Sequence, residues 1–375
     1  MNKRVLITGG AGFIGSNLAL RLINKGHSVI VLDNLSPQIH GDNSELLASI
    51  VNDYEFVLGD VRNRTDWRKC LEGVDVVVHL AAETGTGQSM YEIEKYIDVN
   101  VKGTAILLDI LANEKHDIQK VIVASSRSIY GEGKYTCSIH GEVYPDARRD
   151  ADMKVGDFEV KGPVCNSNLD LLPTDEKSKI HPSSIYGITK QNQEQMVLTA
   201  CQSLGISALA FRYQNVFGPG QSLSNPYTGI LSIFSTRILH KKEIAVFEDG
   251  LQSRDFVFID DVVTATVLGI ESSNKVNGVF NVGSGVPQSV NHVVDQLLKA
   301  FNRSVPVNIN AKYRLGDIRH NYADLTKVQS TFGFQPSVSF ENGIHQFVKW
   351  VLTQEVEEDK YDQSIQEMKD RGLYK

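Results

Sequence analysis

A tyrosine and a lysine four positions apart, Tyr186 and Lys190, are the residues whose chemistry stands out in this sequence. In a helix, positions i and i+4 lie on one face, so the phenol and the ammonium would be neighbours. A free tyrosine ionises near pH ~10, and a nearby cation lowers the pKa of the phenol by favouring the phenolate. The pair therefore predicts a general base that removes a proton from a hydroxyl group. Because Tyr-x-x-x-Lys also arises by chance on exposed helices, this prediction needs support from the rest of the chain.

A glycine-rich segment near the N-terminus provides that support. The apolar stretch 5–8 runs into Gly9, and the pattern Gly10-x-Gly12-x-x-Gly15 follows. Glycines at these positions permit a tight turn, let backbone amides approach a pyrophosphate and let the next helix pack closely on the sheet. The positive end of that helix then faces the anion. The segment predicts a dinucleotide site.

An acidic residue follows at the distance expected for contact with the adenosine ribose. A second apolar stretch, residues 28–32, ends at Asp33, about 20 residues beyond Gly15. A carboxylate there accepts a hydrogen bond from the 2′-hydroxyl and repels a 2′-phosphate, so the sequence predicts NAD and not NADP. A flavodoxin-like turn that binds no dinucleotide is the alternative interpretation.

Short apolar stretches alternate with helical patterns over the first 215 residues, which is typical of a parallel sheet with helices on both faces. We predict an α/β fold whose residues 1–215 form a doubly wound parallel sheet, a Rossmann domain. Polar residues follow several of these strands, at the sheet edge where ligands bind. The further predicted strands are residues 54–58, 74–80, 121–124 and 208–211.

The pattern becomes irregular after residue 215. Residues 216–353, with short strands at 244–247 and 279–282, are predicted to form a smaller mixed α/β lobe that binds substrate. Residues 354–375 are highly charged and predict a C-terminal tail, either a solvated helix or a frayed end.

The composition narrows the classes of function. The chain has 375 residues, of which 41% are hydrophobic, so it can bury a large core. A net charge of −7 without basic runs argues against a nucleic-acid partner. No segment approaches the roughly 18 apolar residues of a membrane span. Four scattered cysteines do not make a disulfide framework. We therefore expect a cytoplasmic enzyme with no membrane partner.

Taken in order, the motifs resemble those of the extended short-chain dehydrogenases/reductases, and among them the NAD-dependent nucleotide-sugar epimerases and dehydratases. The resemblance covers nearly the whole chain. It rests on residues 8–15, 33–35, 59–61, 79–82, 100–104, 125–131, 186–190, 212–220 and 254–257.

The resemblance implies a catalytic triad of Ser126, Tyr186 and Lys190, in which Lys190 also holds the nicotinamide ribose. It implies that Asn100 kinks its helix around a water in the proton path, although an asparagine in a helix more often bonds locally. The cofactor-binding residues that it implies are Gly9, Gly12, Phe13, Ile14, Gly15, Asp33, Asn34, Asp60, Val61, Leu80, Ala81, Ala82, Asn100, Tyr186 and Lys190.

The resemblance also implies a nucleotide-sugar substrate gripped by the second lobe. Arg127, Asn215, Arg254 and Arg314 match positions that contact the nucleotide sugar in relatives, and guanidinium groups suit bidentate phosphate contacts. Asp317 would accept hydrogen bonds from the nucleoside.

Among the activities of such enzymes, inversion of the sugar 4-position through a transient 4-keto intermediate is the one that the residues favour. The 4,6-dehydratases carry an acidic pair after the catalytic hydroxyl, where this chain has Arg127 and Ser128. Dehydrogenation remains an alternative, as does an NAD-sensing module without turnover, although such modules usually lose the tyrosine or the lysine. By family habit, helices at 90–111 and 184–204 would form a homodimer interface.

The gap between Ser126 and Tyr186 is long for this family and predicts an insertion at about residues 131–180, a candidate lid. It contains Cys137-x-x-His140 and Cys165. A zinc knuckle would need a fourth ligand, and Gly162 occupies its place, so no metal is predicted, although a metal-dependent scaffold is a second alternative. The insertion resembles that of 4-epimerases that act on dTDP-6-deoxyhexoses.

Overall fold

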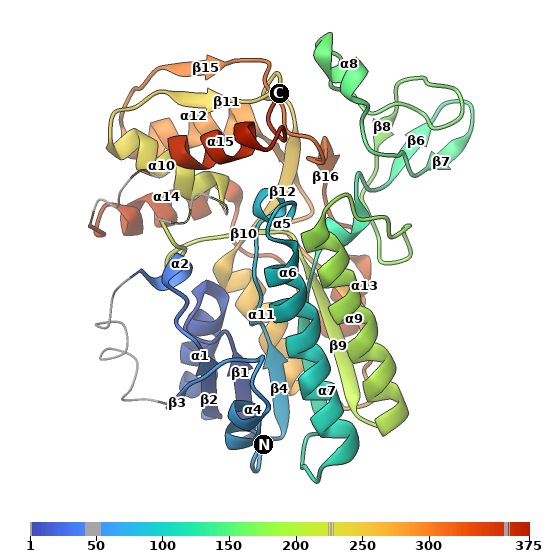
Figure 1. Ribbon diagram of the computed structural model, residues 1–375, viewed down its shortest axis with the longest axis vertical. Helices are drawn as coiled ribbons and strands as arrows, with labels where there is room; N and C mark the ends of the chain where they lie inside the picture. The colour runs from blue at the N-terminus through green and yellow to red at the C-terminus, as the bar shows by residue number, and fades with distance from the viewer. Residues whose placement is uncertain are drawn as a thin grey trace.

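The computed structural model describes residues 2–41, 54–223, 225, 227, 229–355, 359 and 361–375. Within this part of the chain the largest sheet has seven strands, all parallel, in the order β13-β9-β5-β4-β1-β2-β3 (Figure 1). The predicted doubly wound sheet is confirmed. Its strands are β1 Arg4–Thr8, β2 Ser28–Asp33, β3 Glu55–Leu58, β4 Val76–His79, β5 Lys120–Ser126, β9 Ser207–Tyr213 and β13 Gly278–Val282.

Helices cover both faces of this sheet, because apolar side chains of each inner strand alternate between two cores. In β1, Val5 and Ile7 belong to the core beneath α1 (Phe13–Asn24) and α11 (Ile259–Glu271). Leu6 belongs to the core beneath α4 (Arg64–Cys70), α7 (Gly103–Asn113) and α9 (Ile185–Leu204). Burial of each such side chain contributes roughly 1.5–3 kcal/mol, so the sheet is the stable platform on which the site is built.

The predicted boundary at residue 215 requires a correction. Residues 279–282 were assigned to the smaller lobe, but β13 pairs in parallel with β9 at the edge of the main sheet. The Phe280 ring packs on Phe211, with ring centroids 6.2 Å apart. The chain therefore returns from the lobe to complete the sheet, and α11 packs against α1.

The smaller lobe lies above the carboxyl ends of the main strands (Figure 1). Its helices are α10 Ile230–Leu239, α12 Val290–Phe301 and α14 Phe340–Val351. Its strands are β11 Ile244–Val246 paired with β15 Val307–Ile309, and β12 Ser253–Phe258 paired with β10 Asn215–Phe217, β14 Pro287–Ser289 and β16 His320–Asn321. None of the helices in the described part of the chain is long and apolar enough to span a bilayer.

The charged C-terminal segment is more ordered than the prediction of a solvated helix or frayed end. Helix α15, Tyr361–Asp370, buries Ile365 and Met368 against the molecule. The Glu367 carboxylate accepts hydrogen bonds from the hydroxyls of Tyr91, at 3.2 Å, and Tyr227, at 2.7 Å. Residues 356–358 and 360 of the predicted tail lie outside the described residues.

The insertion, all of which is described, forms a three-stranded antiparallel sheet of β6 Tyr135–Cys137, β7 Gly141–Val143 and β8 Asp170–Leu171, with the short helix α8, Asp150–Lys154 (Figure 1). A buried ion-pair network joins it to the second lobe. Arg148 lies 3.5 Å from Glu132 and 2.8 Å from Glu248, and the Arg319 amide donates to Glu132 at 2.7 Å. The backbone at Arg319 is thereby fixed.

Glu132 makes the stability of this junction depend on pH. Burial raises the pKa of Glu132 from 4.5 to about 7, against the opposing charge of Arg148. The folded state thus holds a proton that the unfolded chain has released, and stability falls as pH rises from about 4.5 through 7. We expect Glu132→Gln to lose this part of the pH dependence in urea unfolding at pH 5 and pH 7.5. The exposed control Glu72→Gln should retain the wild-type slope, and an unchanged slope in Glu132→Gln would contradict the assignment.

Candidate active site

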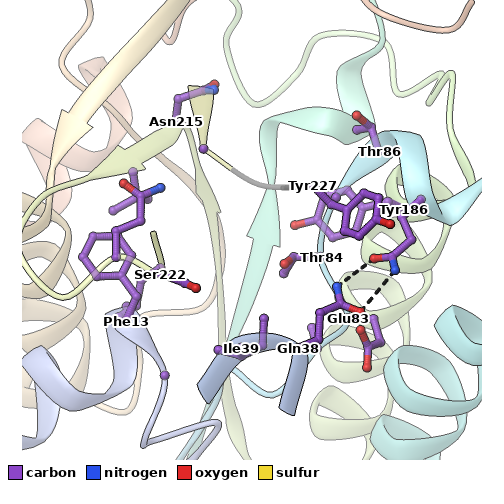
Figure 2. A pocket seen from close by; sticks show the side chains of 18 of the residues that line it. Phe13, Gln38, Ile39, Glu83, Thr84, Thr86, Tyr186, Asn215, Ser222 and Tyr227 are labelled. Atoms are coloured by element: carbon purple, nitrogen blue, oxygen red, sulfur yellow. Dashed lines mark hydrogen bonds between the residues drawn. The ribbon is translucent and has the colours of Figure 1, made fainter. Parts of the chain in front are cut away.

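A cavity of about 1360 Å³ opens at the carboxyl ends of the main strands, between the sheet and the smaller lobe. Every predicted site residue except Asn100 lines it. Figure 2 shows Phe13 and Tyr186 on opposite sides of this cavity, with Asn215 above and Gln38 and Ile39 below. None of residues 131–180 lines the cavity. The insertion was predicted as a candidate lid, but in this structure it lies beside the site and does not cover it.

The glycine turn packs so closely on neighbouring backbone that two of its positions require glycine. Gly9 has φ +68°, and a Cβ there would lie 2.8 Å from the Ala81 nitrogen. A Cβ at Gly15 would overlap the carbonyl oxygen of Gly9. Gly12 is the N-cap residue of α1 and has no side chain that could accept a hydrogen bond from the first-turn amides. These amides therefore face the cavity without a side-chain acceptor. These features suit a pyrophosphate at the helix N-terminus.

The acidic residue at the end of β2 is held in place for hydrogen bonding. The Asp33 side chain accepts from the Ala11 amide at 3.1 Å and from the Leu35 amide at 2.9 Å. These bonds attach the carboxylate to the glycine turn and leave acceptor sites for ribose hydroxyls. At the end of β3, hydrogen bonds from Arg62 lower the pKa of Asp60 to about 2, and Asn34 donates to the same carboxylate at 3.0 Å.

The catalytic candidates come from two neighbouring elements. Ser126 is the last residue of β5, and Tyr186 and Lys190 lie in the first turns of α9. Ser184 caps this helix by accepting from the Gly187 amide. Lys190 Nζ donates to the Ala124 carbonyl at 3.0 Å and lies 6.0 Å from the centre of the Tyr186 ring. The structure thus brings the three side chains to one wall.

The electrostatics of this wall differ from the expectation that Lys190 lowers the pKa of Tyr186. Burial raises the pKa of Tyr186, and a hydrogen bond with Ser126 and the charge of Arg127 oppose that rise. Burial also lowers the pKa of Lys190 to about 7, which weakens its positive charge at neutral pH. The charge of Arg127 thus favours the phenolate, together with the hydrogen bond from Ser126.

Asn100 does not line the cavity. It lies in a π-helical turn, Ile97–Lys102, so the predicted distortion of the helix is present. Its side chain accepts from the Glu83 amide at 2.8 Å and donates to the Glu83 carbonyl at 3.1 Å and to Thr189 Oγ1 at 3.0 Å. These bonds are neither local nor directed into the cavity; they fix the loop after β4 to the catalytic helix.

Two half-buried guanidinium groups also line the cavity. Arg127 donates to Asn215 at 2.6 Å, and Arg254 donates to the carbonyls of Ser253, Ile318 and Arg319 at 2.7 to 2.9 Å. Burial lowers the pKa of both arginines, and neither forms an ion pair with a carboxylate in the described part of the chain. Such a pair of cations suits an anionic ligand.

The remaining predicted substrate residues are paired with each other. Arg314 and Asp317 form a salt bridge of 2.8 Å, and the Arg314 guanidinium lies 5.2 Å from the centre of the Phe247 ring. The Asp317 carboxylate therefore neutralises the charge of Arg314, whereas no such salt bridge is present at Arg254 among the described residues.

Several cavity residues were missed. Thr84 closely follows Ala81 and Ala82, so the position of the strand end was a usable signal for it. Residues from α15 also line the cavity, and the apolar spacing of Ile365 and Met368 was the signal that this helix packs on the molecule. Gln38 and Tyr227 lie in segments whose sequence carries no comparable pattern.

Comparison with known proteins agrees with this geometry. A sequence model of the NAD-dependent epimerase/dehydratase family matches residues 5–148 and 162–283. The chain belongs to this family. It is an enzyme with NAD as cofactor, of the nucleotide-sugar 4-epimerase type, and thus an isomerase. Residues 149–161, which the family match leaves out, fall within the insertion.

Individual relatives cover nearly the whole chain. The dTDP-L-rhamnose 4-epimerase of Burkholderia thailandensis is 35% identical over 93% of this chain and 95% of its own. UDP-glucose 4-epimerase from Thermotoga maritima, solved with UDP-glucose, is 28% identical with a TM-score of 0.74, covering 93% of this chain and 98% of its own. UDP-glucuronic acid 4-epimerase from Bacillus cereus, solved with UDP-glucuronic acid and NAD, is 25% identical with a TM-score of 0.75, covering 93% and 99%.

Proposed function

We propose that this enzyme interconverts dTDP-L-rhamnose and dTDP-6-deoxy-L-talose by inverting carbon 4 of the sugar through a transient 4-keto intermediate. The observation that carries the reaction type is the convergence of Ser126, Tyr186 and Lys190 on the cavity that holds the glycine turn. The similarity to the Burkholderia thailandensis enzyme supports the sugar. Arg127 and Arg254, which have no carboxylate partner among the described residues, support an anionic, diphosphate-bearing substrate.

The cofactor would be held by the residues of the glycine turn and of the neighbouring strand ends. The N-terminus of α1 would take the pyrophosphate, Asp33 the adenosine ribose, and Lys190 the nicotinamide ribose. Asp60 and Val61 would flank the adenine. NAD, when bound, accepts a hydride from the sugar carbon and returns it.

The protein side chains handle the proton and the charge on oxygen. The Tyr186 phenolate would take the proton of the 4-hydroxyl, and the same phenol would give it back when the ketone is reduced from the opposite face. The Ser126 hydroxyl would donate a hydrogen bond to the developing oxygen. Arg127 would favour the phenolate through its positive charge.

A UDP-hexose is the second candidate substrate, because the similar solved enzymes were obtained with UDP-sugars. A 4,6-dehydratase is disfavoured, since Arg127 and Ser128 stand where that reaction needs an acidic pair. An NAD sensor without turnover is disfavoured because Tyr186 and Lys190 are both retained.

A panel of dTDP-, UDP- and GDP-sugars, incubated with the purified enzyme without added cofactor, tests the proposal by proton NMR of the sugar ring. We expect inversion at carbon 4 of dTDP-L-rhamnose and slower or no reaction with the UDP- and GDP-sugars. Preferred turnover of a UDP-sugar would replace the substrate but keep the reaction type. Accumulation of a free keto-sugar would contradict epimerisation.

Asp33 should determine the choice between NAD and NADP. In Asp33→Ser, loss of a charged hydrogen-bond acceptor of roughly 1.5–3 kcal/mol should weaken NAD binding by about tenfold or more. NADP binding should improve because the repulsion of its 2′-phosphate is removed. Calorimetric titration of cofactor-stripped protein measures both constants. The exposed control Asp109→Asn should bind as the wild type does, and an unchanged preference in Asp33→Ser would contradict this role.

A homodimer is proposed on the face formed by α6 (Ile93–Tyr96), the π-helical turn, α7 and α9. Helices α7 and α9 pack side by side, and Ile93, Ile97 and Ile188 expose 47%, 39% and 39% of their surface there. Light scattering should give twice the monomer mass, and a charge at Ile97 should reduce it.

A further inference from the structure

The insertion brings two cysteines and a histidine together. Cys137 ends β6, His140 lies in the turn that leads to β7, and Cys165 lies in the loop before β8. Cys137 Sγ lies 3.5 Å from His140 Nδ1 and 3.6 Å from Cys165 Sγ. The three ligand atoms all lie within 4.8 Å of one another. None of these residues lines the active-site cavity.

Two of the three separations are close to the edges of a zinc coordination tetrahedron. With Zn–S of about 2.3 Å and Zn–N of about 2.05 Å, a tetrahedral angle gives about 3.8 Å between two sulfurs and about 3.6 Å between sulfur and nitrogen. The observed 3.6 Å and 3.5 Å lie close to these values. A disulfide would instead require about 2.05 Å between the sulfurs.

The loops around the cluster are shaped for a metal-bound thiolate. The Ile139 amide donates to Cys137 Sγ at 3.4 Å, so the chain turns around the sulfur. Ser167 Oγ lies next to both sulfurs of the cluster, 2.9 Å from Cys165 Sγ and 3.6 Å from Cys137 Sγ. A hydroxyl or a water held at this position would complete a set of four ligands.

Besides its small sheet and the ion pairs of Arg148, the insertion has a small apolar core. Its own apolar cluster consists of Met153 and Phe158, packed with Tyr313 and Leu315 of the second lobe. Three of its large apolar side chains, Ile139, Val155 and Val164, are 70% to 82% exposed. In small units with little apolar core, a bound metal ion can add to the stability.

We propose that Cys137, His140 and Cys165 bind one structural zinc ion, with the fourth position taken by the Ser167 hydroxyl or by a water bound to it. Two thiolates and a neutral imidazole would coordinate the ion, and the two thiol protons would be released to solvent. The ion would tie the β6–β7 turn to the loop before β8. It would thereby stabilise the insertion, which contacts the second lobe through the ion pairs of Arg148 with Glu132 and Glu248.

Metal analysis of the full-length protein, purified under reducing conditions, tests the site. We expect about one zinc per chain in the wild type and in Cys201→Ala, which removes a buried cysteine far from the cluster. Cys137→Ala and His140→Ala should both lose the zinc. Because His140 is exposed, its replacement should leave the fold intact even if the buried Cys137→Ala variant misfolds. A metal-free wild type that also fails to bind added zinc chloride, or zinc retained in Cys137→Ala, would overturn the proposal.

Cobalt substitution and a third cysteine in the cluster give a second readout. Cobalt(II) in the stripped protein should show thiolate-to-metal charge-transfer absorption, and its absence would overturn the proposal. A Cβ at Gly162 would lie 2.9 Å from Cys165 Sγ, so a side chain there would reach the cluster after a small shift of that sulfur. Gly162→Cys should therefore tighten zinc binding at least tenfold in competition with a chromophoric chelator. A Cys137–Cys165 disulfide in freshly reduced protein, with no metal, would count against the site.

Discussion

Tyr186→Phe should lower kcat of the epimerase by about 10³-fold, because it removes the group that takes and returns the proton. The ring itself should stay in place, since it packs edge-on against Tyr96 with centroids 6.4 Å apart. The measurement is kcat by NMR with saturating dTDP-L-rhamnose, together with calorimetric titration of NAD. We expect NAD binding to change little, because the phenol is only one of many cofactor contacts.

Tyr144→Phe is the matched control for this variant. Tyr144 lies in the insertion, and its hydroxyl bonds to the exposed Glu142 at 2.8 Å. Its loss should leave kcat unchanged. If Tyr186→Phe retained more than a tenth of the wild-type kcat, Tyr186 would not be the general base.

Arg254→Met should weaken binding of the free nucleotide dTDP by about 10- to 100-fold. The guanidinium is half-buried, is fixed by three carbonyl oxygens and forms no ion pair with a carboxylate among the described residues, so its charge is available to the diphosphate. Charged hydrogen bonds of roughly 1.5–3 kcal/mol correspond to this range. Methionine keeps most of the side-chain volume. Calorimetry with dTDP measures the loss.

Two further variants show whether the loss of dTDP affinity is specific to the charge at Arg254. Arg314→Met should have a smaller effect, because Asp317 already neutralises that guanidinium. Arg149→Met, at an exposed side chain of the insertion, should have none. Because Arg254 also satisfies buried carbonyls, the unfolding temperature and NAD binding should be measured alongside. Wild-type dTDP affinity in a folded Arg254→Met would contradict the assignment of the diphosphate site.

The sequence predicted best what depends on local pattern. The buried strands of the main sheet read as continuous apolar stretches, and the glycine turn and Asp33 follow fixed spacings, so both were correctly placed. The pairing of β13 with β9 and the docking of α15 depend on contacts between distant segments, which local patterns do not contain. Their roles in completing the sheet and the cavity therefore emerged only from the structure.

Electrostatic roles were the least predictable part of the site. The spacing of Tyr186 and Lys190 correctly put both on one wall, but burial weakens the charge of Lys190. Arg127, expected only as a substrate contact, has a charge that lowers the pKa of the phenol. Burial is a property of the whole fold, and a four-residue spacing carries no information about it. The same holds for Asn100, whose partner Glu83 lies on another element.

The hydrogen on carbon 4 of the sugar offers the most direct test of the proposed epimerisation. dTDP-L-rhamnose deuterated at that carbon should yield the 4-epimer with the deuterium still in place, because the hydride that leaves the carbon is the one returned to its other face. Proton and deuterium NMR of the product in ordinary water measures this retention. Exchange of the deuterium for a solvent proton, or equally fast inversion by Tyr186→Phe, would contradict it.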